Sequence, residues 1–104
     1  MDSYGMRAIL IDPKATPAIS EIKIKGDLAG IQNLVGGYIE AIGIGNDVLF
    51  VDEDWSVKEP SKRHKGEFLI GKTKVGGRGL ILGPKGEKST KLKLLEASSM
   101  ITIL

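Results

Sequence analysis

The 104-residue chain contains no cysteine, only five aromatic residues and no apolar run near the roughly 20 residues of a membrane span. The lack of cysteine excludes disulfides, thiolate nucleophiles and cysteine-ligated metals, and it is compatible with a reducing cytoplasm. Residues 1–5 lack the basic and apolar regions of a secretory signal. Because Met6 opens an apolar segment, we expect residues 1–5 to be a dispensable leader before a single domain over residues 6–104.

Basic residues are scarce in the first half of the chain, and acidic residues are scarce in the second half. Residues 1–57 carry four Lys/Arg and nine Asp/Glu, whereas residues 58–104 carry eleven and four. A basic half indicates either an anionic partner or a solvated face, and two halves of opposite charge also favour self-association. Together with the apolar C-terminal segment, this asymmetry predicts a homo-oligomer.

The apolar pattern predicts an α+β domain with a mostly antiparallel sheet of five or six strands and one short helix packed on it. Between Gly26 and Gly36, the apolar residues fall on one helical face, with Asp27 as N-cap and Gly36 as the left-handed stop. Residues 95–104 are ambiguous between a second short helix and a strand. The predicted strands are Met6–Asp12, Ile19–Lys25, Tyr38–Ile44, Val48–Asp52, Glu67–Gly71 and Gly79–Gly83. Ser89–Leu94 alternates as well and is a candidate for a last strand.

Glycine and basic residues gather between the strands that end at Gly71 and begin at Gly79. We expect the segment 72–78 to be flexible, with the Gly76 and Gly77 amides forming a concavity for an anion and Lys72, Lys74 and Arg78 supplying charge. The alternative is a mobile turn with scattered surface charge. Lys62 and Arg63, from a basic run on an expected exposed loop, would add charge, and the alternative is a solubilising loop. Tyr38 or Trp55 would stack on a base, and the alternative for Trp55 is a buried place in the core.

The pattern of a phosphate-binding loop is present at Gly66–Thr73, but its chemistry is not expected. The loop residues between its glycines are Glu-Phe-Leu-Ile, which favour a strand, and the glycines that follow cannot start a helix. His64 is the only histidine and has no sequence-adjacent carboxylate, so neither a metal site nor a general base is predicted there. The three carboxylates of Asp52–Asp54 indicate a solvated turn rather than an ion site. We therefore expect no enzyme activity, no cofactor and no metal.

Three segments of the chain carry a resemblance to a known family. They are Arg7-Ala-Ile-Leu-Ile-Asp-Pro13, Leu34-Val-Gly-Gly-Tyr-Ile-Glu-Ala41 and Val48-Leu-Phe-Val-Asp-Glu-Asp54. Over Met6 to Arg63 the chain resembles the small family catalogued as domain of unknown function 3846. The family usually has a Leu-Pro-x-Asn-Arg element after the acidic turn, where this chain has Glu59-Pro-Ser-Lys-Arg63. The resemblance implies an accessory protein of a phage, plasmid or conjugative element that acts in a bacterial host's cytoplasm.

These observations lead to one expected function and two alternatives. We expect a non-enzymatic protein that binds and sequesters an anionic nucleotide signal of host antiviral defence. One alternative is a protein-binding inhibitor of a host defence or nuclease complex. The other is a weak DNA- or RNA-binding accessory factor, whose affinity would fall steeply with salt.

Overall fold

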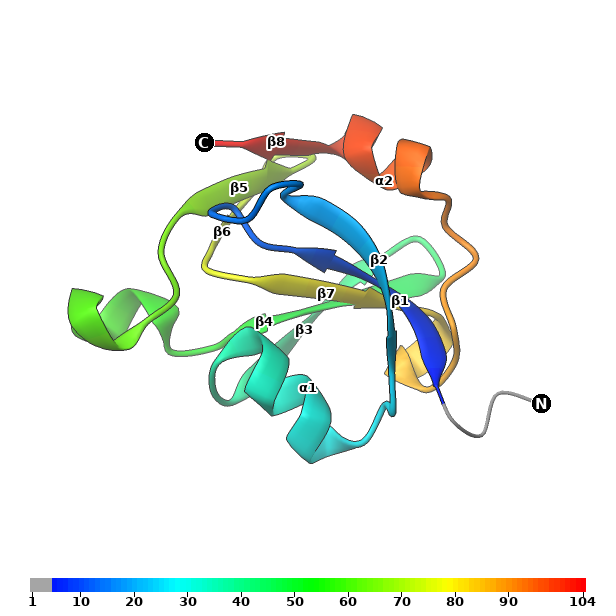
Figure 1. Cartoon of the computed structure of the whole chain (residues 1–104), viewed down its shortest axis with the longest axis horizontal. Helices are drawn as coiled ribbons and strands as arrows, with labels where there is room; N and C mark the ends of the chain where they lie inside the picture. Colours follow the sequence, from blue (N-terminus) through cyan, green and yellow to red (C-terminus); the bar gives the residue numbers. More distant parts are fainter. Residues whose placement is uncertain (1–4) are drawn as a thin grey trace.

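The computed structural model describes residues 5–104 as an α+β domain of two antiparallel sheets and two short helices. The order of elements along the chain is visible in Figure 1. The helices are α1 (Leu28–Val35) and α2 (Leu94–Met100), and single 3₁₀ turns lie at Trp55–Val57, Pro60–Lys62 and Pro84–Gly86. The strands are β1 (Met6–Ile11), β2 (Ile19–Ile24), β3 (Ile39–Ile44), β4 (Asp47–Asp52), β5 (Glu67–Ile70), β6 (Thr73–Gly76), β7 (Gly79–Leu82) and β8 (Ile101–Ile103).

The larger sheet has the strand order β2-β1-β7-β4-β3, and the smaller has the order β6-β5-β8. Hairpins join β1 to β2, β3 to β4 and β5 to β6, with registers such as Ile9↔Glu21 and Ala41↔Phe50. The late strand β7 enters the middle of the larger sheet, between β1 and β4. The α+β class and its largely antiparallel pairing are therefore confirmed, with the strands divided between two sheets rather than one.

Both faces of the larger sheet are covered, which explains why its central strands are apolar at successive positions. Ala8, Phe50, Leu80 and Leu82 pack on one face against Ile31 and Val35 of α1. The alternate residues pack on the other face, which Figure 1 shows to be covered by the smaller sheet and α2. This second set consists of Ile9, Ile11, Leu49, Val51 and Ile81 from the larger sheet with Phe68, Ile70, Val75, Ala97 and Ile101 opposite.

Helix α1 forms as its sequence predicts. The Asp27 carboxylate accepts a hydrogen bond from the Gly30 amide at 2.8 Å, which satisfies one of the free amides of the first turn. Gly36 ends the helix in the left-handed region, with φ 99°, and its amide donates to the Gln32 carbonyl. The chain then turns directly into β3, so the end of α1 lies beside the end of β4.

Two local predictions are corrected by the structure, and one ambiguous segment is resolved. The segment 72–78 is not a flexible linker, because Thr73–Gly76 pairs with β5 as β6. Residues 89–93 form no strand, and Arg7 instead holds them beside β1 through hydrogen bonds from its Nη1 to the carbonyls of Thr90 (3.0 Å) and Leu92 (2.6 Å). The ambiguous end resolves into both alternatives, a helix to Met100 and then strand β8.

Four residues of the predicted leader, 1–4, lie outside the described part of the chain, so that prediction stays untested. Within residues 5–104, no helix is long and apolar enough to cross a membrane.

Replacing Gly79 with alanine tests the packing between the two sheets. A β-carbon at Gly79 would lie 2.8 Å from Phe68 Cζ and 2.9 Å from Leu49 Cδ1. We expect Gly79→Ala to lower the free energy of unfolding by about 1–3 kcal/mol through overpacking, measured by urea denaturation. Gly43→Ala is the matched control, because a β-carbon there meets nothing within 4 Å. Equal stability of the two variants would contradict the packing described here.

Candidate functional site

The glycines predicted to cradle an anion instead form the seat of the Trp55 indole. A β-carbon at Gly76 would lie 2.1 Å from Trp55 Cε3, and one at Gly77 would lie 2.7 Å from Trp55 Cδ1. The Gly77 amide donates to the Gly66 carbonyl at 2.9 Å, so it is not free to bind phosphate. The glycines are therefore explained by close packing against a ring, and the Gly77 amide is bonded within the fold.

The indole of Trp55 packs against both a cation and a glycine backbone. The guanidinium carbon of Arg63 lies 3.8 Å from the ring centroid, while the backbone at Gly76 packs against the same ring. Trp55 Nε1 donates to the His64 carbonyl at 2.6 Å, and Arg63 Nη1 donates to the Trp55 carbonyl at 2.9 Å. Trp55 and Arg63 thus order the 55–64 segment, and the Trp55 ring is already in contact with Arg63 and with the backbone at Gly76.

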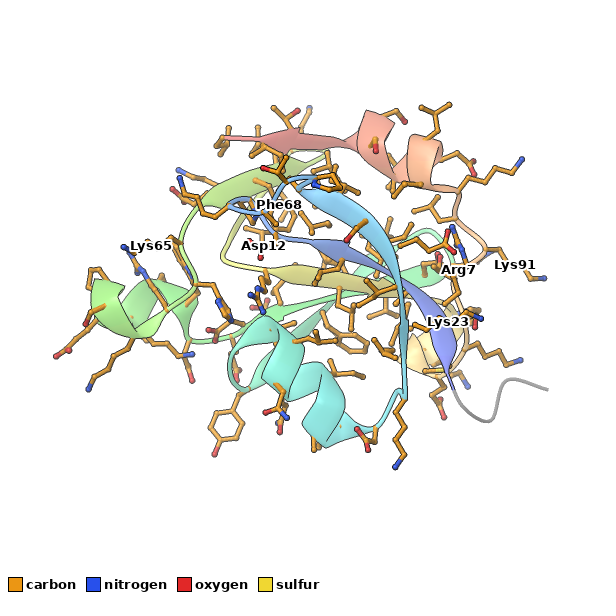
Figure 2. The ribbon with its side chains drawn as sticks, in the orientation of Figure 1. Arg7, Asp12, Lys23, Lys65, Phe68 and Lys91 are labelled. Carbon is orange, nitrogen blue, oxygen red and sulfur yellow. The ribbon has the colours of Figure 1, made fainter. Side chains whose placement is uncertain are left out.

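The predicted cationic ligands do not converge on one point. Lys72 is exposed at the β5–β6 turn, Lys74 lies 3.5 Å from Glu67, and Lys62 lies 3.9 Å from Glu59. Arg78 faces inward, where its Nε donates to Asp12 Oδ2 at 3.1 Å and its Nη1 to the Leu34 carbonyl at 3.4 Å. Other basic residues are also spread over the molecule, since Figure 2 shows Arg7, Lys23 and Lys91 on the right and Lys65 on the left.

A cluster of charged groups does assemble at the C-terminal end of α1, and we call it the helix-end cluster: Asp12, Asp52, Lys58, His64 and Arg78. Asp52 ends the buried strand β4 and is only 5% exposed. Its Oδ2 accepts from Lys58 Nζ at 2.6 Å, and its Oδ1 accepts from the Asp54 amide at 3.0 Å. Lys58 Nζ also donates to the Gly36 carbonyl at 2.8 Å. Since Arg78 donates to the Leu34 carbonyl, both cations lie at the negative end of the helix dipole.

Gly36 and Gly37 leave the space that this cluster occupies. A β-carbon at Gly36 would come within 2.8 Å of His64 Cδ2, and one at Gly37 within 2.8 Å of Lys58 Nζ. Gly36 also needs its positive φ, whereas Gly37 is needed only for the close approach. This glycine pair, in the segment Leu34–Ala41, therefore makes room for the cluster, and Gly36 also ends the helix.

A hollow of about 520 Å³ opens beside the helix-end cluster. Tyr38 directly follows the glycine pair and precedes β3. Its side chain projects into solvent at the rim of this hollow, and 67% of its surface is exposed. Lys58 lines the same hollow, so the cluster and the hollow share a side chain. We call it the Tyr38 hollow, and its lining residues are Gln32, Asn33, Gly36, Gly37, Tyr38, Asp54 and Lys58.

Asp52, Lys58 and His64 were assigned to no site from the sequence, although one sequence signal indicated the Asp52–Lys58 pair. Asp52 directly continues the apolar run Val48–Val51, and a carboxylate at such a position needs a cation partner. Lys58 is the first cation that follows it in the chain. The approach of His64 to Gly36 had no local signal, because it depends on how the 55–66 segment folds back. Among residues 5–104, no group of three or more His, Asp and Glu is arranged to hold a metal ion.

The pKa of His64 is lowered from its ordinary value, first by desolvation and then by the positive charge of Arg78, while Asp12 and Asp52 act in the opposite direction. Protonation is then easier in the unfolded chain than in the folded one. Stability should therefore fall as the pH drops through about 6.5, the unfolded value, toward the lower folded pKa.

Replacing His64 with glutamine tests this linkage. We expect His64→Gln to show a weaker loss of unfolding free energy than the native protein between pH 7.5 and the onset of carboxylate titration. Thermal denaturation at a series of pH values measures the difference. Parallel pH profiles for the two proteins would show that His64 titrates alike in the folded and unfolded chains.

Comparisons with known proteins identify the family and no closer relative. No curated protein and no solved structure matches the chain. A family model described as "Domain of unknown function (DUF3846)" matches residues 6–100. That range takes in β1 through α2 and includes the helix-end cluster, the Tyr38 hollow and the glycine pair. The chain belongs to this family of domains of unknown function.

Proposed function

We propose that this protein is a non-enzymatic binding protein that holds a nucleotide in the Tyr38 hollow. The observation that carries the proposal is an exposed aromatic ring at the rim of a hollow of about 520 Å³ that is also lined by a fixed ammonium group. Small-molecule sites typically measure about 300–1,000 Å³. This site differs from the segment 72–78 that was predicted from the sequence. In that segment the Gly77 amide, Lys74 and Arg78 already interact with other groups of the protein.

The planar part of the ligand would stack on Tyr38. Aromatic side chains bind bases through their faces, and the Tyr38 ring is largely free to do so. Gln32 and Asn33, from the last turn of α1, line the same hollow and provide amide donors and acceptors for a base edge. The Asp54 carboxylate can accept from ribose hydroxyls or from amino and imino groups of a base.

The anionic part would bind at Lys58. An ammonium group has three donors, and two of those on Lys58 are directed to Asp52 and the Gly36 carbonyl. The third remains for a ligand, on a side chain that is already held in place and 24% exposed. Such a prearranged donor loses little conformational entropy on binding. The nearby Asp54 disfavours phosphate on its own side, so the phosphate is expected on the Lys58 side.

The biological role in this proposal is sequestration rather than turnover. A phage or mobile-element protein that withdraws a nucleotide signal from host antiviral defence needs affinity and no chemistry. Linear and cyclic nucleotides of the kind used as signals are therefore the first ligands to measure.

The Tyr38→Ala variant tests the proposal. Loss of one stacked base is worth about 1–3 kcal/mol, so we expect the dissociation constant for the best nucleotide of such a panel to rise about 5- to 150-fold in calorimetry. Tyr38→Phe should keep most of the affinity, because it retains the ring. Val57→Ala is the matched control, since Val57 is 81% exposed and does not line the hollow. Failure of every nucleotide to bind, or equal affinity of Tyr38→Ala and the native protein, would refute the proposal.

A further inference from the structure

Two strand edges remain unpaired on either side of one groove. Among the described residues, β3 pairs only with β4 at the edge of the larger sheet, and β6 pairs only with β5 at the edge of the smaller one. A free strand edge presents a row of backbone donors and acceptors that another strand can pair with. No backbone hydrogen bond outside the β3–β4 ladder involves residues 39–44 within the described chain.

Hollows of about 240, 510 and 440 Å³ form one groove along β3, which we call the β3–β6 groove. Ile42 and Thr73 line both of the first two hollows, and Ile44 and Met100 line both of the last two. The β3 side chains that line these hollows, those of Glu40, Ile42 and Ile44, lie on one face of the strand, and Gly43 contributes only backbone. The groove therefore runs along one face of the edge strand β3.

The free edge of β3 lacks the features that protect edge strands. Its sequence, Ile-Glu-Ala-Ile-Gly-Ile, has no lysine or proline and a single charge at Glu40. The opposite edge of the same sheet, β2, carries the exposed charges Glu21 and Lys23 at alternating positions. The contrast indicates that β3, and not β2, is the edge available for pairing.

Charge specifies one end of an occupant. Glu40 and Glu53 line the end of the groove near Trp55, and both are exposed and without an ion pair among residues 5–104. Lys74 lines the same end but lies 3.5 Å from Glu67. This end therefore favours a basic side chain. Further along, Ile42, Ile44 and Met100 offer apolar contacts to alternate residues of an extended segment.

We propose that the β3–β6 groove binds an extended segment of a partner protein, which adds a strand to β3 and carries a Lys or Arg at the end that meets Glu40 and Glu53. Backbone hydrogen bonds would supply affinity, while the alternating apolar contacts and the basic residue would supply specificity. This surface is separate from the Tyr38 hollow, so the inference does not depend on the proposed nucleotide.

Synthetic peptides test the groove directly. The probe is Ser-Val-Thr-Val-Ser-Val-Thr-Arg with blocked termini, and its reversed sequence covers the opposite strand direction. We expect amide shifts in NMR spectra, and slower hydrogen exchange, to be confined to β3 and β6 at millimolar peptide. A peptide in which serine replaces valine should give no shifts. Absence of shifts with both directions of the probe, or shifts outside the groove, would overturn the proposal.

A charge exchange separates recognition from damage to the fold. Glu40→Lys should weaken the binding of the arginine peptide by about fivefold and strengthen the binding of a peptide that ends in glutamate by a similar factor. A misfolded variant would bind neither peptide, and unchanged preference would refute the proposed orientation. A stable dimer with β3 already protected in the absence of peptide would also overturn the proposal, because a second copy would then fill the groove.

Discussion

The carboxylate of Asp52 is the polar group on which the candidate site depends. It lies at the end of a strand buried on both faces, where a charge without partners would be strongly unfavourable. Lys58 and the Asp54 amide provide those partners, and Lys58 also donates to the carbonyl of Gly36, the residue that ends α1. One buried carboxylate therefore connects β4, the acidic turn, the segment after it and the end of the helix. The position of Tyr38, two residues beyond Gly36, follows from these contacts.

The glycines of this chain are explained by what approaches them. Gly36 and Gly37 leave room for His64 and Lys58, and Gly76 and Gly77 leave room for the Trp55 ring, which Arg63 also contacts. The two pairs hold the 55–64 segment between the end of α1 and β6. This segment carries no regular strand, yet the described contacts fix it at both ends. Within this segment, Arg63 contacts the Trp55 ring, Lys62 is exposed, and Lys58 is held by Asp52 and Gly36 where it lines the Tyr38 hollow.

The local sequence was enough to predict most elements, because hydrophobic alternation, Asp27 and Gly36 act over a few residues. The predictions failed where long-range contacts decide. Ser89–Leu94 alternates like a strand, but Arg7 binds its carbonyls and no ladder forms. Glycine near β6 suggested flexibility, although a distant tryptophan orders it. The cluster was missed for the same reason: Asp12, Asp52, His64 and Arg78 come from separate parts of the chain. Tyr38 alone, among the predicted ligand residues, lies exposed at the rim of the hollow with a free ring.

The most direct test is a double-mutant cycle on the Asp52–Lys58 pair, with the variants Asp52→Asn, Lys58→Met and their combination. Removing one partner of a buried pair costs about 3–5 kcal/mol, and the partial exposure of Lys58 places the expected cost near the lower limit. If the pair organises the end of α1, the two changes will be coupled by at least about 1 kcal/mol of unfolding free energy, and amide exchange at residues 34–38 will quicken in each single variant. Additive costs, with exchange at these residues unchanged, would contradict the account.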